Sequence, residues 1–139
     1  MATTVTKKSI SAAAAARAIR ACEAKAKEIG VPMCIAVCDE SGVLKAFTRM
    51  DGAALLSIQI AQDKAYTAVG FGMPTDQWYP FIKDDGPLAL GAPKVDRLII
   101  FGGGYPVKAG EAIVGAIGVS GGHYTQDMEV AKAGLAAVS

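Results

Sequence analysis

Residues 31–49 have the sequence VPMCIAVCDESGVLKAFTR, and this pattern predicts a β-hairpin. Residues 31–38 form a continuous apolar run, which is typical of a buried strand. Residues 39–42, Asp-Glu-Ser-Gly, favour a turn, and residues 43–48 return to an extended pattern. We therefore expect two antiparallel strands that end where the segment from Arg49 to Gly52 interrupts the pattern.

Helices are predicted on both sides of this hairpin in the chain. The segment before it has apolar residues at helical spacing up to Ile29, with Thr6 or Ser9 as the candidate cap and Gly30 as the end. A second helix is predicted over about residues 53–69, and a last helix is expected to open at Thr125. Each helix has an apolar face that needs burial against another element.

The chain between the second and the last helix is predicted to contain an excursion and further strands. Residues 72–92 combine prolines with Trp78, Tyr79 and Phe81, which favours an ordered excursion with at most a short helix. Residues 97–101 are predicted as a strand, and residues 106–120 as a second hairpin that turns at Ala109-Gly110. This order indicates an α+β fold with helices packed on an antiparallel sheet, and not a doubly wound parallel sheet.

Composition limits the classes of function. The 139 residues are 52% hydrophobic, which predicts one domain over residues 1–139 that folds without a disulfide or a metal. A formal net charge of +1 and an aromatic content of 6% argue against a nucleic-acid partner. The alanine tract at residues 12–16 is too short to span a bilayer and is no secretory signal, so we expect a cytoplasmic protein with no membrane partner. Cys22, Cys34 and Cys38 are expected to be buried free thiols.

Two side chains are candidates for general acid–base chemistry. His123 is the only histidine and lies in a loop after two glycines, where it can act as a general base or a haem ligand, or be a plain surface residue. Lys64 lies off the polar stripe of its helix. Its ammonium group either reaches water along the stem, or points into a pocket, or pairs with Asp51 or Asp63. Both residues are kept as candidate catalytic residues.

Candidate ligand contacts follow the first hairpin and the triple glycine at residues 102–104. Arg49 and Asp51 leave the chain on the same side, so they can pair with each other or hold a polar ligand together. Tyr105 and Pro106 can supply a wall of the same cavity. A metal site is not predicted, because the chain has one histidine and none of the known metal-binding spacings.

The glycine-rich segment at residues 115–122 has two interpretations. Glycines in a strand commonly admit a neighbouring backbone, so close packing is expected. Ser120 and Gly121 also precede the last helix, whose free N–H groups can bind a carboxylate or a carbonyl. The alternative is that this loop only caps the helix.

Five motifs together resemble the GlcG/HbpS family, which includes the haem-binding or haem-degrading-type domain at the C terminus of PduO proteins. They are AVCDESG (36–42), RMDGA (49–53), DKAYTA (63–68), FGGGYP (101–106) and VGAIGVSGG (114–122) with Gln126-Asp127. The resemblance spans about residues 5–138. It implies a profilin-like arrangement of α/β/α layers with a central five-stranded antiparallel sheet, and assembly into homo-oligomers from dimers to octamers.

The resemblance also implies a shared pocket, and the matching positions are Arg49, Asp51, Lys64, Gly103, Pro106, Ser120 and Gly121. Members of the family bind haem, accompany corrinoid enzymes or are encoded with catabolic enzymes. Haem is the only cofactor that the resemblance implies. No haem-ligating residue is carried over. His123 departs from the threonine or small polar residue usual in its loop.

The sequence is compatible with three functions, one of which makes the chain an enzyme. The first is an oligomeric protein that binds a small molecule, most directly haem or a related tetrapyrrole. The second is a cofactor-independent lyase or isomerase acting on a small carboxylate or aromatic catabolite, with His123 or Lys64 as general base and Arg49 on the carboxylate. The third is an oligomeric accessory protein whose glycines serve packing only.

Overall fold

The computed structural model describes residues 1–139 and contains one antiparallel sheet with the strand order β2-β1-β4-β3. The strands are β1 (Cys34–Asp39), β2 (Leu44–Arg49), β3 (Gly104–Ala109) and β4 (Ala112–Ser120). In the register of the sheet, Cys34 pairs with Arg49 on one side and with Ser120 on the other. Both predicted hairpins are confirmed, and their strands β1 and β4 lie together at the centre of the sheet.

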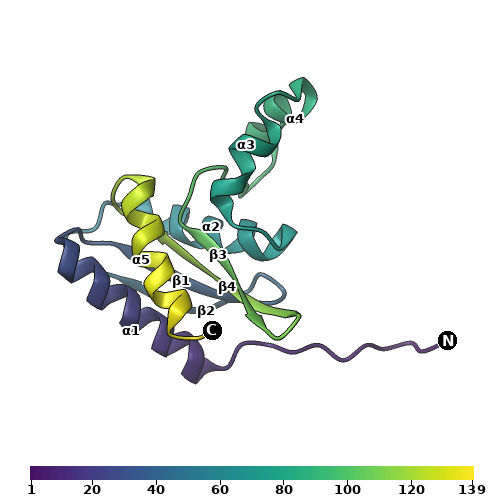
Figure 1. Cartoon of the computed structure of the whole chain (residues 1–139), viewed down its shortest axis with the longest axis horizontal. Coiled ribbons are helices and arrows are strands. Elements are labelled where there is room, and N and C mark those ends of the chain that lie inside the picture. The colour runs from purple at the N-terminus through teal and green to yellow at the C-terminus, as the bar shows by residue number, and fades with distance from the viewer.

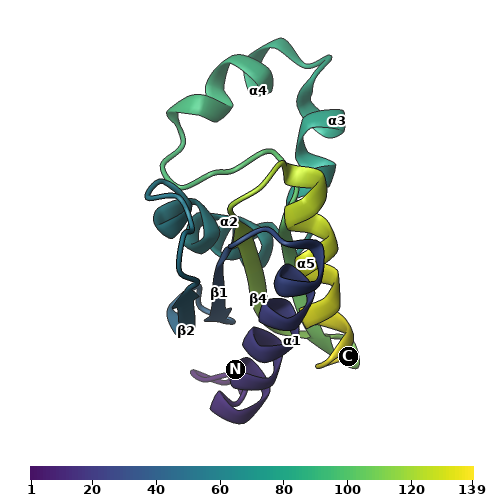
Figure 2. The same cartoon turned by 90° about the vertical axis from the view of Figure 1, so that its left-hand side faces the viewer.

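Helices cover both faces of this sheet (Figures 1 and 2). Helices α1 (Ala12–Ile29) and α5 (Tyr124–Ala136) pack side by side on one face, and α2 (Ser57–Phe71) packs on the other. The face below α1 and α5 buries large side chains such as Ile35 and Ile117, whereas the face below α2 buries small ones. A Cβ atom on Gly118 would lie 2.0 Å from the carbonyl oxygen of Ala61, so the backbone of α2 rests directly on β4. The glycine-rich strand therefore serves close packing.

The first helix begins later than the sequence predicts. Its N-cap is Ser11, whose side chain accepts a hydrogen bond from the N–H of Ala14, and neither Thr6 nor Ser9 has this role. The N–H of Ile10 donates instead to the carbonyl of Val114 in the sheet, which holds the preceding chain in an extended path. The predicted end at Gly30 is confirmed, because Gly30 adopts a left-handed conformation with φ of 74°.

The expectation of a five-stranded sheet is wrong, because residues 97–101 are not a strand. Arg97 has a φ of 64°, which no strand residue adopts. The hydroxyl of Thr67 on α2 donates to the carbonyl of Arg97 and accepts from the N–H of Ile99. A side chain of α2 thus takes the hydrogen bonds that a neighbouring strand would have made, and four strands remain.

The excursion forms an arm that projects from the sheet, as both views show (Figures 1 and 2). The arm consists of residues 75–94 and contains two short α-helices, α3 (Trp78–Ile82) and α4 (Gly86–Gly91), between 3-10 turns. The ring of Trp78 packs edge-on against Phe71 at the end of α2, with centroids 5.1 Å apart. Helix α2 itself begins at Ser57, four residues after the predicted start. None of the helices is long and apolar enough to cross a membrane.

Candidate functional site

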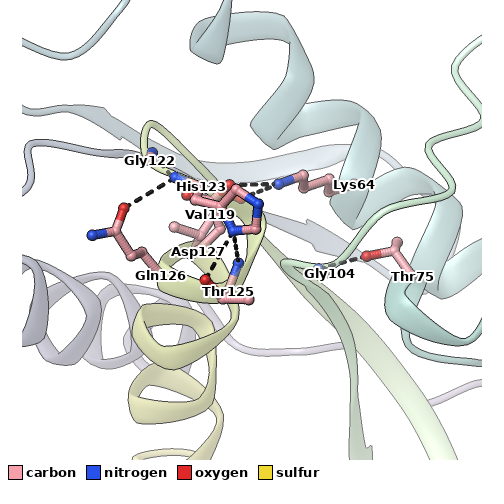
Figure 3. Close-up of polar contacts among 9 residues, drawn as sticks. All are labelled: Lys64, Thr75, Gly104, Val119, Gly122, His123, Thr125, Gln126 and Asp127. Carbon is pink, nitrogen blue, oxygen red and sulfur yellow. Dashed lines mark hydrogen bonds and ion pairs between the residues drawn. The ribbon is translucent and has the colours of Figure 1, made fainter.

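Most of the predicted site residues lie at one end of the sheet, where β2 and β4 end and β1 and β3 begin. Lys64 reaches this end from α2, and His123 lies just beyond it at the start of α5 (Figure 3). The last residue of β2 and the last residue of β4 lie on opposite sides of β1. These two places carry different chemistry.

Lys64 is buried in an ion pair and does not reach water. Its Nζ donates to Asp127 Oδ2 at 2.8 Å and to the carbonyl of Val119 at 2.9 Å (Figure 3). The side chains of Lys64 and Asp127 are 0% and 3% exposed. Burial lowers the pKa of Lys64 and raises that of Asp127, each against the attraction of the other charge. The predicted alternatives, snorkelling or a partner at Asp51 or Asp63, are therefore wrong.

This ion pair fixes the start of α5 on the sheet. The second oxygen of Asp127, Oδ1, accepts the N–H of Gly122, so one carboxylate holds both the loop and α2. Gly103 is part of the same packing, since a Cβ atom there would lie 2.8 Å from Lys64 Nζ and 2.6 Å from the carbonyl of Val119. Ser120 is buried, and a Cβ atom on Gly121 would lie 2.6 Å from the carbonyl of Pro32. This loop is thus closely packed.

His123 is the N-cap of α5. Its Nδ1 accepts a hydrogen bond from the N–H of Thr125, and its own N–H donates to Gln126 Oε1, which completes a capping box (Figure 3). The imidazole is exposed and lies against the ring of Tyr124, with centroids 4.1 Å apart. The helix therefore begins one residue before the predicted Thr125. The same Nδ1 lies 2.9 Å from the hydroxyl oxygen of Thr125.

A cavity of about 370 Å³ opens beside these residues, between the arm and α5. Its walls include three aromatic side chains, and we call it the aromatic cavity. The lining residues are Asp76, Tyr79, Pro80, Ile100, Phe101, Gly102 and Tyr124. This volume lies within the range of about 300–1,000 Å³ that is usual for small-molecule sites. The ring of Phe101 separates the cavity from Lys64, whose Nζ lies 5.1 Å from the ring centroid.

Two buried polar groups meet behind the wall of the aromatic cavity. Tyr105 is buried and does not line the cavity, but its phenol faces Asp76, which does. Burial, with the negative charge of Asp76 as the second cause, raises the pKa of the Tyr105 phenol. Tyr105 Oη and Asp76 Oδ1 are both buried, and neither makes a hydrogen bond of good geometry. Pro106, the next residue, lies in the edge strand β3.

Arg49 and Asp51 lie apart from the aromatic cavity, where β2 ends. They line a polar cleft of about 380 Å³ together with Glu23 and Lys27 of α1. The Arg49 guanidinium donates from Nε and Nη2 to the carbonyl of Ala53, at 3.2 and 2.9 Å. No ion pair joins Arg49 to Asp51 at the 4.0 Å limit. The structure thus divides the predicted ligand contacts between two places.

Sequence reasoning missed Asp76, Phe101 and Tyr124 as lining residues and Asp127 as the partner of Lys64. A lysine on an apolar helix face signals that a buried acid must exist elsewhere, but this signal does not say which one. Asp76 lies in an irregular segment, where no periodicity predicts the direction of a side chain. The structure places no group of three or more His, Cys, Asp or Glu side chains where they could hold a metal ion.

Comparison with known proteins supplies the family. Residues 10–136 match the family model described as haem degrading protein HbpS-like. The uncharacterized 15.0 kDa protein of the dhaT-dhaS intergenic region of Citrobacter freundii is 39% identical over 127 residues, which cover 91% of this chain and 89% of that protein.

Solved structures agree with this match over nearly the whole chain. The crystal structure of Klebsiella pneumoniae protein ORFY has a TM-score of 0.91 and 34% identity, and the match covers 99% of this chain and 96% of that one. The crystal structure of the PduOC–haem complex has a TM-score of 0.88 and 28% identity, with 94% and 96% covered. The resemblance of the motifs to GlcG/HbpS proteins is thereby confirmed, and the chain belongs to the HbpS-like family.

Proposed function

We propose that the chain binds a tetrapyrrole, haem or a related one, in the aromatic cavity. The observation that carries this proposal is the gathering of Tyr79, Phe101 and Tyr124 around a cavity of about 370 Å³. Aromatic rings stack on flat macrocycles and bury much apolar surface. The family model is described as haem degrading, and the related PduOC domain forms a complex with haem, which supports the choice of ligand.

The donor groups at this site suit a haem. Tyr79, Phe101 and Tyr124 would hold the macrocycle, and the Tyr124 phenol would offer an oxygen donor that haem iron accepts. When bound, haem would supply an iron centre for ligand binding or electron transfer. The protein residues would bind the ring and limit the access of water to it.

Titration with haemin tests the proposal, with Tyr79→Ala compared against Phe81→Ala. Both residues are exposed aromatics of α3, 59% and 64%, but only Tyr79 lines the cavity. Binding is followed by the Soret band and by quenching of Trp78, the only tryptophan. We expect saturable binding that Tyr79→Ala weakens by about tenfold and Phe81→Ala leaves nearly unchanged. Equal effects of the two variants, or no saturable binding, would reject the site.

The lyase or isomerase hypothesis stays a prediction, and the geometry does not favour it. Both candidate bases have structural roles. Lys64 is committed to Asp127 and the carbonyl of Val119, and His123 caps α5. Arg49, the expected carboxylate contact, lines the separate polar cleft. No arrangement here brings a base and a cation to one substrate, so we do not advance this function.

We also propose that the chain forms homo-oligomers through the arm. The arm exposes large apolar side chains, including Tyr79, Phe81, Leu88 and Leu90, and exposed apolar clusters are typical of interfaces. Leu90→Asp places a charge on the arm, and Leu55→Asp is a matched control at an exposed leucine before α2. In sedimentation experiments Leu90→Asp should shift the wild-type oligomer to monomer, and Leu55→Asp should not. A monomeric wild type, or an oligomer that survives Leu90→Asp, contradicts this.

The three cysteines support a cytoplasmic location, which we propose as well. Cys22, Cys34 and Cys38 are buried free thiols and form no disulfide. Free thiols persist in reducing compartments such as the cytoplasm. Fractionation of cells that express the protein with its natural ends tests this, since it should appear with cytoplasmic markers and not with secreted ones.

A further inference from the structure

The polar cleft at the end of β2 is lined by charged side chains of both signs that have no charged partner. The cleft has a volume of about 380 Å³, and the charged residues that line it are Glu23, Lys27, Arg49 and Asp51. No ion pair within 4.0 Å joins any two of them, and none of them pairs with a charge elsewhere in the chain. Two positive and two negative side chains therefore line one cleft without neutralising each other.

These charges come from two segments that face each other across the cleft. Glu23 and Lys27 are four residues apart on α1, so they lie on the same face of this helix. A glutamate four residues before a lysine is the order that favours an ion pair on a helix, yet this pair is not formed. Arg49 is the last residue of β2, and Asp51 lies in the turn that follows. Each segment thus brings one cation and one anion.

The guanidinium of Arg49 is fixed in place and still has donors to give. Its Nε and Nη2 both donate to the carbonyl of Ala53, at 3.2 and 2.9 Å. The N–H of Ala53 donates to the carbonyl of Met50 at 3.0 Å, which closes the turn that carries this acceptor. Three of the five N–H groups of the guanidinium remain, on Nη1 and Nη2, and adjacent N–H groups of this kind bind the two oxygens of a carboxylate side by side. A side chain that is already ordered loses little entropy when a ligand binds.

The balance of charge in the cleft favours a ligand that carries both signs. A simple carboxylate would be attracted by Arg49 and Lys27 but repelled by Glu23 and Asp51, and for a simple amine the signs are reversed. A molecule with one carboxylate and one ammonium group can meet the cations with the first and the anions with the second. The volume of about 380 Å³ suits a small molecule.

We propose that the polar cleft is a second binding site, for a small zwitterion of the amino acid class. Arg49 binds the carboxylate through its free N–H groups, with Lys27 as the second cation, and Asp51 and Glu23 accept hydrogen bonds from the ammonium group. Met50 also lines the cleft and packs against the hydrophobic core, so it offers apolar surface to the carbon chain of the ligand. The cleft shares no lining residue with the aromatic cavity, so this site is independent of tetrapyrrole binding.

Calorimetric titration with a series of amino acids tests this proposal. The series consists of glycine, β-alanine, γ-aminobutyrate and ε-aminocaproate, in which the distance between the two charges increases. Butyrate and butylamine are the controls, because each has a chain like that of γ-aminobutyrate but only one charge. We expect the best zwitterion to bind about tenfold more tightly than either control. A control that binds as tightly as every zwitterion, or no binding of any zwitterion, would overturn the proposal.

Three variants place the site in the cleft. Asp51→Asn should reduce the preference for the best zwitterion over butyrate to about twofold, because it removes a partner of the ammonium group alone. Arg49→Lys keeps the charge but lacks the planar fork, so it should weaken the best zwitterion and butyrate alike by about tenfold. Asp84→Asn is the matched control, at an exposed position of the arm outside the cleft, and should change neither affinity.

The outcomes distinguish this site from the aromatic cavity. If Asp51→Asn binds every ligand as Asp84→Asn does, the proposed site is refuted, whatever the affinity for haemin. Haemin binding by the same preparations reports on the aromatic cavity alone, so the failure of one site leaves the other standing. Should Asp51→Asn not fold, the order of the wild-type affinities still decides.

Discussion

Replacement of Lys64 by methionine should destabilise the protein strongly, because it leaves Asp127 buried without its cation. Methionine keeps the length of the side chain, so the change reports mainly on charge. Asp127 is 3% exposed and would retain only the N–H of Gly122 as a hydrogen-bond donor. Removal of one partner from a buried ion pair costs about 3–5 kcal/mol. We expect about 3 kcal/mol at pH 7, since Asp127 can escape part of the cost by protonation.

The pH dependence of this loss has a definite sign. Burial raises the pKa of Asp127 above its ordinary value of 3.8 even with Lys64 present, and without the cation the pKa rises further. A carboxyl whose pKa is raised in the folded state stabilises the protein most below the unfolded pKa, and this stabilisation is lost as pH rises. The cost of Lys64→Met should therefore be smallest near pH 4 and grow toward pH 7.

Urea unfolding at a fixed protein concentration measures these free energies in a double-mutant cycle with Asp127→Asn. The asparagine amide keeps an acceptor for Gly122 but carries no charge. Each single variant should lose about 3 kcal/mol, whereas the double variant should lie within about 1 kcal/mol of wild type, because neutral groups of similar shape replace a buried pair at little cost. A double variant that loses the sum of the single effects would refute the coupling.

Three further predictions concern the core, the thiols and the polar cleft. Gly118→Ala should reduce the free energy of unfolding by about 3 kcal/mol or more, because its Cβ would lie 2.0 Å from the Ala61 carbonyl oxygen; a soluble variant as stable as wild type in urea would contradict this packing. Burial raises the pKa of Cys22 to about 12 and of Cys38 to about 11, so the unfolded chain loses these protons first. Stability should fall above pH 9 by about 2.7 kcal/mol per pH unit, and a Cys22→Ala/Cys38→Ala variant should show a flatter profile. Arg49→Ala should leave tetrapyrrole affinity within about twofold in a fluorescence titration, because Arg49 lines the other cleft, and a tenfold loss would show that the cleft takes part.

Local signals predicted the fold well where a single residue type controls the backbone. Gly30 ends α1 in the left-handed conformation, as expected of glycine at this position, and the two turns give the predicted hairpins. The prediction of a fifth strand is wrong because of a contact with a residue outside the segment. Residues 97–101 are apolar enough for a strand, but the hydroxyl of Thr67 on α2 takes the hydrogen bonds of the Arg97 carbonyl and the Ile99 N–H.

The site was harder to predict because it depends on contacts between distant segments. Lys64 and His123 stand out in the sequence, yet Lys64 pairs with Asp127, 63 residues away, and His123 caps a helix. The aromatic cavity combines the arm, the loop after it and the first residue of α5. Tyr79 belongs to a segment rich in aromatic residues, whereas nothing in the sequence places Asp76 at the same wall of the cavity.

A crystal structure of the protein with a bound tetrapyrrole, obtained with haemin and with protoporphyrin IX, tests where the ligand binds. We predict that the macrocycle lies among Tyr79, Phe101 and Tyr124 in the aromatic cavity. A macrocycle seated elsewhere, for example in the polar cleft at Arg49, would contradict the proposed function of this cavity.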